Sequence, residues 1–226
     1  MNHKIELWHG SSHIIEKPLF GYGKPYNDYG LGFYCTESRE LAKEWACTEN
    51  QDGYANHYEL EAAGLDVMNL SSGGYHVLHW LALLIDNRVF QPTAPIARQG
   101  IQYLKEYFLP DISRFDVIVG YRADDSYFSF ARAFLNNTIS LNQLAQAMRL
   151  GKLGEQFVLK SEKAFLQIHF IEYEAADAEV YYVKRKSRDE EARRAYREQA
   201  ALDDLSGLYL RDIMREGVKA DDLRLR

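Results

Sequence analysis

The chain has 226 residues, of which 46% are apolar, so it can bury the core of one ordinary domain, and a wholly disordered protein is excluded. Its 27 lysines and arginines against 33 aspartates and glutamates leave a net charge of −6, which argues against coating nucleic acid or anionic membrane through bulk charge. Cys35 and Cys47 lie outside any His/Cys cluster, so we expect two reduced cysteines. The longest apolar segment, residues 77–85, is about half a membrane span, and the first ten residues lack a signal-like stretch. We therefore expect a cytoplasmic protein without a membrane partner.

In the first part of the chain, two predicted strands enclose a glycine-rich loop and a helix. The loop covers residues 21–32, where four glycines and one proline favour tight turns. Ser38 predicts the N-cap of the helix, because apolar residues, Trp45 among them, follow it at the i, i+3, i+4 spacing. The strands are expected at residues 4–8 and 54–60.

The central part of the chain mixes helices with buried strands. Ser140 and Gly151 mark the expected ends of one of these helices. In chain order, we expect helices at 75–87 and 96–108, a strand at 116–120, helices at 128–135 and 140–150, and strands at 156–160 and 167–173. Strands thus occur at both ends with helices inserted between them, which predicts an α+β fold.

The composition changes after about Lys184. Residues 184–199 hold seven basic and four acidic residues and no large aliphatic one, which is typical of a solvated helix. An amphipathic segment is expected to follow, with one apolar face made of Leu202, Leu205, Leu208, Ile213 and Met214. The sequence therefore predicts a domain at 1–183 and a charged helical extension at 184–226, which either docks a partner or folds back on its own core.

Three short motifs lie at the ends or starts of predicted strands, where side chains can converge on a cleft. They are LWHGS at residues 7–11, GLGFY at 30–34 and EQFVL at 155–159. Each alone is typical of ordinary structure, but their order and spacing resemble the ADP-ribosyltransferase superfamily. The similarity is to its diphtheria-toxin/poly(ADP-ribose)-polymerase-like branch with a His-Tyr-Glu triad, and within it to a bacterial group with a His-Tyr-Gln pattern. The resemblance extends from Ile5 to about Phe170.

The resemblance implies a split β-sheet core with inserted helices and a C-terminal helical appendage, and NAD as the substrate. It implies that His9 bonds the adenosine-side ribose, while the Gly10 backbone fixes the carboxamide with the Ser11 hydroxyl nearby. It also implies that Tyr34 stacks against the nicotinamide. The residues predicted to bind NAD are His9, Gly10, Ser11, Tyr29, Gly32, Phe33, Tyr34 and Arg122.

Gln156 stands where the polymerases carry a glutamate, and with His9 and Tyr34 it completes the implied catalytic triad. An amide can hydrogen-bond the 2′-hydroxyl of the nicotinamide ribose, but it takes up no proton and offers no full negative charge to an oxocarbenium ion. This argues against chain elongation and favours a single transfer, with the acceptor activated elsewhere. Because neighbouring residues of a strand point to opposite faces, we expect Gln156 rather than Glu155 to face the site.

A polar segment at residues 120–127 follows the predicted strand at 116–120. In one interpretation it is a helix cap, in which Asp124 or Asp125 accepts hydrogen bonds from free amides. In the other, Arg122 binds a phosphate of NAD or of the target, and an aspartate activates the acceptor.

The glycine-rich loop also carries Tyr22, Tyr26 and Tyr29, which form either a mobile lid over NAD or a loop packed by its own rings. We expect Tyr29, just before GLGFY, to face the site. The histidines outside the first motif show no metal-ligand spacing, so we expect no metal.

The resemblance therefore predicts a mono-ADP-ribosyltransferase that transfers ADP-ribose from NAD to a macromolecule and releases nicotinamide. It further implies the toxin of a bacterial toxin–antitoxin or defence pair, with an antitoxin protein as partner. A protein acceptor is favoured, and RNA or DNA stays open because residues 184–199 could follow a phosphate backbone. The alternatives are a catalytically inactive interaction module that retains the fold, and an NAD glycohydrolase that uses water as the acceptor.

Overall fold

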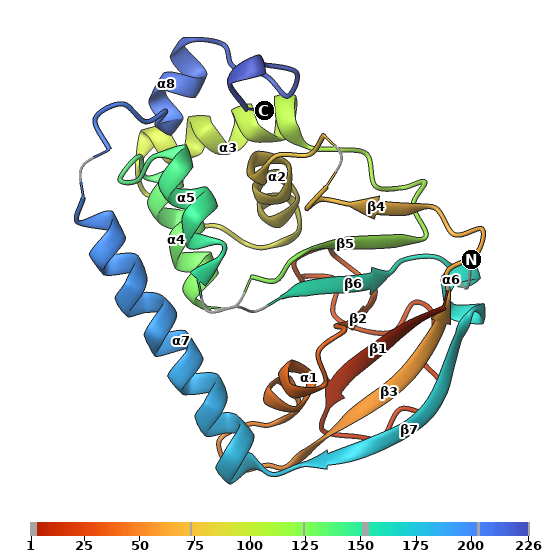
Figure 1. Ribbon diagram of the computed structural model, residues 1–226. Coiled ribbons are helices and arrows are strands. Elements are labelled where there is room, and N and C mark those ends of the chain that lie inside the picture. The colour runs from red at the N-terminus through yellow and green to blue at the C-terminus, as the bar shows by residue number, and fades with distance from the viewer. Residues whose placement is uncertain (1–3, 73, 124, 151–153, 203, 226) are drawn as a thin grey trace.

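The structure is a computed structural model that describes residues 4–72, 74–123, 125–150, 154–202 and 204–225 (Figure 1). Within these residues, seven strands form two sheets and eight α-helices pack around them. The expected α+β class is confirmed.

Sheet A is antiparallel and has the order β1-β3-β7, formed by Lys4–Ser11, Gly53–Glu61 and Ile168–Ala176. Sheet B has the order β2-β6-β5-β4, formed by Phe33–Cys35, Glu155–Leu159, Val117–Tyr121 and Val67–Asn69. Only the β4–β5 pair of sheet B is parallel among the described strands. Side chains of both sheets, such as Leu7 and Phe157, share one apolar core.

The two sheets meet at a corner where β1 passes the end of β2. Trp8 N–H donates to the Thr36 carbonyl at 2.7 Å, and Thr36 N–H donates to the Trp8 carbonyl at 2.9 Å. Thr36 directly follows β2, so these two bonds bring the LWHGS and GLGFY motifs together.

A larger apolar core lies on the other face of sheet B, against the central helices (Figure 1). Strand residues alternate between the two cores: Val117 and Val119 of β5 face sheet A, whereas Ile118 faces the helices. Residues 78–85 of the first central helix are all buried, because this helix lies in the middle of the group. The central helices are α2 (Val77–Asn87), α3 (Pro95–Phe108), α4 (Asp125–Leu135) and α5 (Leu141–Ala147).

Helix α1 (Arg39–Ala46) packs directly on the end of β1. Ser38 caps it as expected, with its side chain accepting from Leu41 N–H at 3.3 Å. A Cβ added to Gly10 would lie 2.0 Å from the Ala42 carbonyl oxygen, so only glycine permits this approach. The short helix α6 (Glu162–Leu166) joins β6 to β7.

Helix α7 (Ala178–Ala200) runs along one side of the molecule, from α1 to α4 and α5 (Figure 1). Near the middle of the helix, Arg188 makes two hydrogen bonds, at 2.9 and 2.7 Å, to the buried Glu44 carboxylate of α1. Further along, the Tyr196 ring stacks on Phe130 with centroids 4.2 Å apart. The helix is therefore a strap over the core as well as a charged surface.

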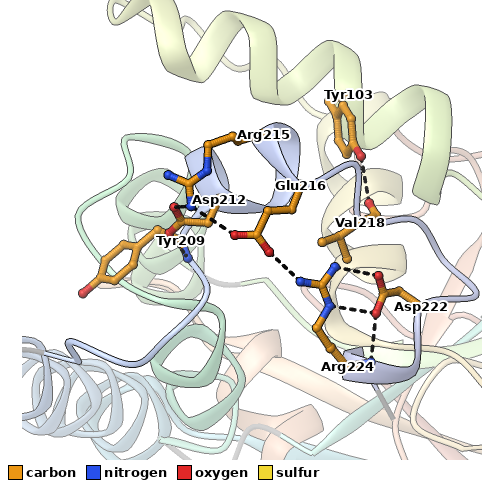
Figure 2. Close-up of polar contacts among 8 residues, drawn as sticks. All are labelled: Tyr103, Tyr209, Asp212, Arg215, Glu216, Val218, Asp222 and Arg224. Carbon is orange, nitrogen blue, oxygen red and sulfur yellow. Dashed lines mark hydrogen bonds and ion pairs between the residues drawn. The ribbon is translucent and has the colours of Figure 1, made fainter.

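The segment after α7 also packs on the core. Leu210 and Ile213 of α8 (Leu210–Arg215) and Val218 are fully buried beside α3. Figure 2 shows how its end is held: the Tyr103 hydroxyl donates to the Val218 carbonyl at 2.9 Å, and Arg224 bridges Glu216 and Asp222. A 3-10 turn at Leu223–Leu225 follows.

The expected elements are present, and the structure differs from the predictions at four points. Strand β4 was not expected, and α5 ends at Ala147 rather than residue 150, while Gly151 lies outside the described residues. The predicted apolar face of the tail is wrong, because Leu202 and Leu205 are 70% and 95% exposed while Ile213 is buried. The predicted boundary at 183/184 falls inside α7, and of the two readings of the tail, the structure has the one in which it folds back on its own core.

The thiols of Cys35 and Cys47 are both free and buried. No helix in the described part of the chain is long and apolar enough to cross a membrane.

Packing of the tail predicts a large effect of Ile213→Ala. Removing buried methyl groups leaves a cavity, so the free energy of unfolding should fall by about 2–5 kcal/mol in a urea titration. Leu205→Ala is the matched control, since Leu205 is exposed, and it should change this free energy by less than about 0.5 kcal/mol. Equally small losses in both variants would contradict the packing described above.

Candidate functional site

A cavity of about 810 Å³ opens at the corner where the two sheets join. It is lined by the end of β1, the loop that follows it, β2, α1, the start of β6 and the segment after β5. All three sequence motifs reach it. The predicted site residues that line it are His9, Gly10, Ser11, Gly32, Phe33, Tyr34, Arg122 and Gln156.

His9 is fixed by both of its neighbours in the second motif. Its Nδ1 lies 2.7 Å from the Tyr34 carbonyl oxygen, and its ring stacks on Phe33 with centroids 4.4 Å apart. A carbonyl oxygen only accepts, so Nδ1 carries the proton and Nε2 of the neutral ring is an acceptor. Burial lowers the pKa of His9 below its usual value of 6.5, against the opposing effect of the Tyr34 carbonyl. His9 is therefore a neutral acceptor at the cavity wall.

Tyr34 has its hydroxyl occupied by its own loop. The hydroxyl donates to the Gly30 carbonyl at 2.5 Å and accepts from the Tyr29 N–H at 3.1 Å. Burial raises the pKa of this phenol, which stays protonated. The ring of Tyr34 is thus held in a fixed place on the cavity wall, and its aromatic surface, not its hydroxyl, is what it offers a ligand.

Lys160 holds the same loop from the other side. Its ammonium donates to the Tyr29 carbonyl at 2.7 Å and to the Leu31 carbonyl at 2.5 Å. Gly30, between these residues, has φ +73°, a left-handed conformation that favours glycine. The turn that leads into GLGFY is therefore organised without a ligand.

As expected, Gln156 lines the cavity, and its side chain is 4% exposed. Glu155, the preceding residue of β6, does not line it and pairs with Tyr121 of β5. Gln156 Nε2 donates to Asp28 Oδ2 at 3.1 Å. Asp28 is itself 5% exposed, and the same oxygen accepts from Ala123 N–H at 2.9 Å. A buried carboxylate thus lies beside the residue that replaces the glutamate.

The cavity is cationic although the chain is acidic. Four of its lining side chains are Lys17, Lys24, Arg88 and Arg122, whereas Asp28 is the one carboxylate among the described residues that line it. The Arg122 guanidinium lies over the Trp45 ring, 3.9 Å from its centroid. With a net charge of −6 on the whole chain, this concentration of positive charge favours an anionic ligand such as a phosphate.

Tyr29 does not line the cavity, contrary to expectation. Its ring is fully buried under Gly120, and its hydroxyl donates to the Tyr121 carbonyl at 2.7 Å. Of the loop tyrosines, Tyr22 lines the cavity instead, and Tyr26 is exposed. The reason is that the Tyr29 ring packs in the apolar core of the central helices, where the Tyr121 carbonyl satisfies its hydroxyl.

Four contributors to the site carried no recognisable signal in the sequence. Lys17, Lys24 and Asp28 lie in the long loop between β1 and β2, which has no periodicity to show their direction. The spacing predicts Trp45 on the apolar face of its helix, yet Trp45 lines the cavity.

Asn56 of β3 was also missed, although it shapes the rim. It is fully buried, its amide nitrogen donates to the carbonyls of His9 and His13 at 3.2 Å, and its amide oxygen accepts from Ile15 N–H at 2.9 Å. A buried amide with these partners fixes the path of the chain after His9.

The aspartate expected to activate the acceptor is not among the described residues that line the cavity. Asp124 lies outside the described residues, and Asp125 begins α4. In the described part of the chain, no group of three or more His, Cys, Asp or Glu side chains could hold a metal ion.

A family described as "Protein of unknown function (DUF3990)" matches residues 5–170. The match covers more than half of the chain, so the chain belongs to this family. All three motifs lie within the matched region. Searches of curated proteins and of solved structures gave no match.

The lowered pKa of His9 predicts a pH-dependent contribution to stability. Because the folded state disfavours the imidazolium, this contribution is present above pH 6.5 and is lost as the pH falls below 6.5. The free energy of unfolding of His9→Gln should therefore fall less steeply than that of wild type between about pH 7 and 5. Parallel curves in urea titrations at each pH would show that burial does not keep His9 neutral.

Proposed function

We propose that this member of the DUF3990 family is a mono-ADP-ribosyltransferase, which cleaves NAD and transfers ADP-ribose to a macromolecule. The observation that carries the proposal is that His9, Tyr34 and Gln156, from three distant motifs, line one cavity rich in cations. The cavity volume of about 810 Å³ is in the range of sites that hold ligands of this size. The joined sheets A and B would be the split core of this superfamily.

The role of each residue follows from its own environment. Neutral His9 would accept a hydrogen bond from a ribose hydroxyl at Nε2, because Nδ1 already donates to the Tyr34 carbonyl. The fixed Tyr34 ring would stack on nicotinamide and favour its departure as a neutral ring. Gln156 would bond the hydroxyl next to the reacting carbon. Positioning of both sides of the scissile bond lowers the barrier to its cleavage.

The cations would hold the two phosphates. Arg122 is kept in place by Trp45, and guanidinium groups match phosphate oxygens with two parallel hydrogen bonds. The flexible Lys17 and Lys24 are exposed at the rim and would add charge without fixed geometry. This division predicts that Arg122 contributes more to affinity than either lysine.

The wider role rests on the sequence resemblance. We propose a toxin of a toxin–antitoxin or defence pair, acting in the cytoplasm on a protein acceptor and neutralised by an antitoxin protein. Since Leu210 and Ile213 of α8 are buried in the core, these two residues are not the surface that we assign to this partner.

Nicotinamide release from NAD by the purified protein tests the activity. His9→Ala, Tyr34→Ala and Gln156→Ala should each reduce the rate by at least about 100-fold, because each removes a group that positions the reacting bond. His13→Ala and Tyr26→Ala are the matched controls, since both side chains are exposed and neither residue lines the cavity. Both should keep the wild-type rate.

A cell lysate with labelled NAD, treated in parallel, identifies the acceptor. Label in a protein supports transfer, whereas release without label shows an NAD glycohydrolase. Neither release nor an NAD-dependent rise in melting temperature would leave an inactive interaction module.

Arg122→Gln should weaken NAD binding, because it removes a guanidinium from the phosphate subsite. The expected loss is about tenfold in Kd by calorimetry, or about 1.4 kcal/mol. Arg211→Gln is the control, since Arg211 is exposed on α8 and does not line the cavity. Equal Kd values for the two variants would place the phosphates elsewhere.

A further inference from the structure

Asp28 is a buried carboxylate at the wall of the cavity, and one of its oxygens accepts no hydrogen bond from the described residues. It is 5% exposed, and its Oδ2 already accepts from Ala123 N–H and Gln156 Nε2. Its Oδ1 is buried without a hydrogen-bond donor among the described residues, where it forms an ion pair with Arg88 Nη1 at 3.5 Å. A structural carboxylate would be expected to have both oxygens bonded, since burial of an unsatisfied one is costly.

The contact between Asp28 and Gln156 sets the direction of the amide. A carboxylate only accepts hydrogen bonds, so the nitrogen of Gln156 must face Asp28, and its Oε1 is directed away from this carboxylate. Among the described residues, the recorded hydrogen bond of the Gln156 side chain is the one from Nε2, and Oε1 has no donor. Hydrogen bonding to a carboxylate also polarises the amide and makes Oε1 a stronger acceptor.

Two arginines and two hydrogen-bond donors beside Asp28 favour its charged form, against the effect of its burial. Burial raises the pKa of Asp28, while the Ala123 amide, Gln156, Arg88 and Arg122 oppose this shift. Arg88 also lies 5.4 Å from the Phe128 ring centroid, which keeps its guanidinium beside the carboxylate.

From this geometry we infer that Asp28 is a catalytic residue that supplies the carboxylate which Gln156 lacks. The inference rests on the proposed function and deepens it. As the bond between the ribose carbon and the nicotinamide nitrogen breaks, its electron pair leaves with nicotinamide, and the ribose becomes a cation. The Asp28 charge, directly and through polarised Gln156, stabilises this cation. The acceptor hydroxyl then forms the new C–O bond and gives its proton to Oδ1 of Asp28, which releases it to solvent.

The competing explanation is that Asp28 only holds the chain at Ala123. A swap of the two functional groups separates these roles. Asp28→Asn removes the carboxylate, whereas the double variant Asp28→Asn/Gln156→Glu moves it to position 156 and keeps one amide and one carboxylate in contact. A charge role predicts recovery in the double variant, and a purely structural role does not.

Nicotinamide release and NAD affinity are measured for wild type and for these two variants. Asp28→Asn should lower kcat by about 100-fold or more, with a Kd for NAD within about threefold of wild type. The double variant should be at least about tenfold faster than Asp28→Asn. Asp86→Asn is the control, because Asp86 is an exposed residue paired with Lys105 on the surface, and it should match wild type.

Three results overturn the inference. An Asp28→Asn rate within about threefold of wild type removes any catalytic role. A folded double variant, judged by an unchanged melting temperature, that is no faster than Asp28→Asn assigns Asp28 to structure alone. Absence of turnover in wild type is a different outcome, which overturns the proposed function and the inference with it.

Discussion

The candidate site depends on one local interaction, the pair of backbone hydrogen bonds between Trp8 and Thr36. These bonds join sheet A to sheet B at a corner, and the residue after Trp8 is His9, which then reaches the Tyr34 carbonyl. Because β2 is also paired with β6, the same corner brings Gln156 to the cavity. Backbone pairing therefore positions the three motifs, and their side chains need little further adjustment to meet.

The charge of the cavity lining is opposite in sign to the net charge of the chain. Although the chain is acidic, four cationic side chains line the cavity. Asp28, which is buried, is the one carboxylate among the described lining residues. Lysines at the rim are free to follow a ligand, whereas Arg88 and Arg122 lie over the rings of Phe128 and Trp45. Such an arrangement suits a substrate that carries negative phosphates and develops positive charge on one ribose.

Much of the fold and part of the site could be predicted from the sequence, for physical reasons that differ by residue. His9, Tyr34 and Gln156 lie in strands, where period-two alternation sets the direction of each side chain. Asp28 and Lys17 lie in a loop whose path depends on distant contacts, including the amide of Asn56 and the ammonium of Lys160. The prediction of one apolar face for the tail is wrong for a related reason. Its leucines fit a helical period, but the helix formed only at Leu210–Arg215, where α3 offers an apolar surface.

The most direct test is a crystal structure of the protein with an NAD analogue whose glycosidic bond cannot be cleaved. The account predicts the nicotinamide ring against Tyr34, a ribose hydroxyl on Gln156 Oε1 and a phosphate within hydrogen-bonding distance of Arg122. An analogue bound outside the cavity at the sheet junction would contradict it. So would an empty cavity in crystals grown with the analogue in large excess.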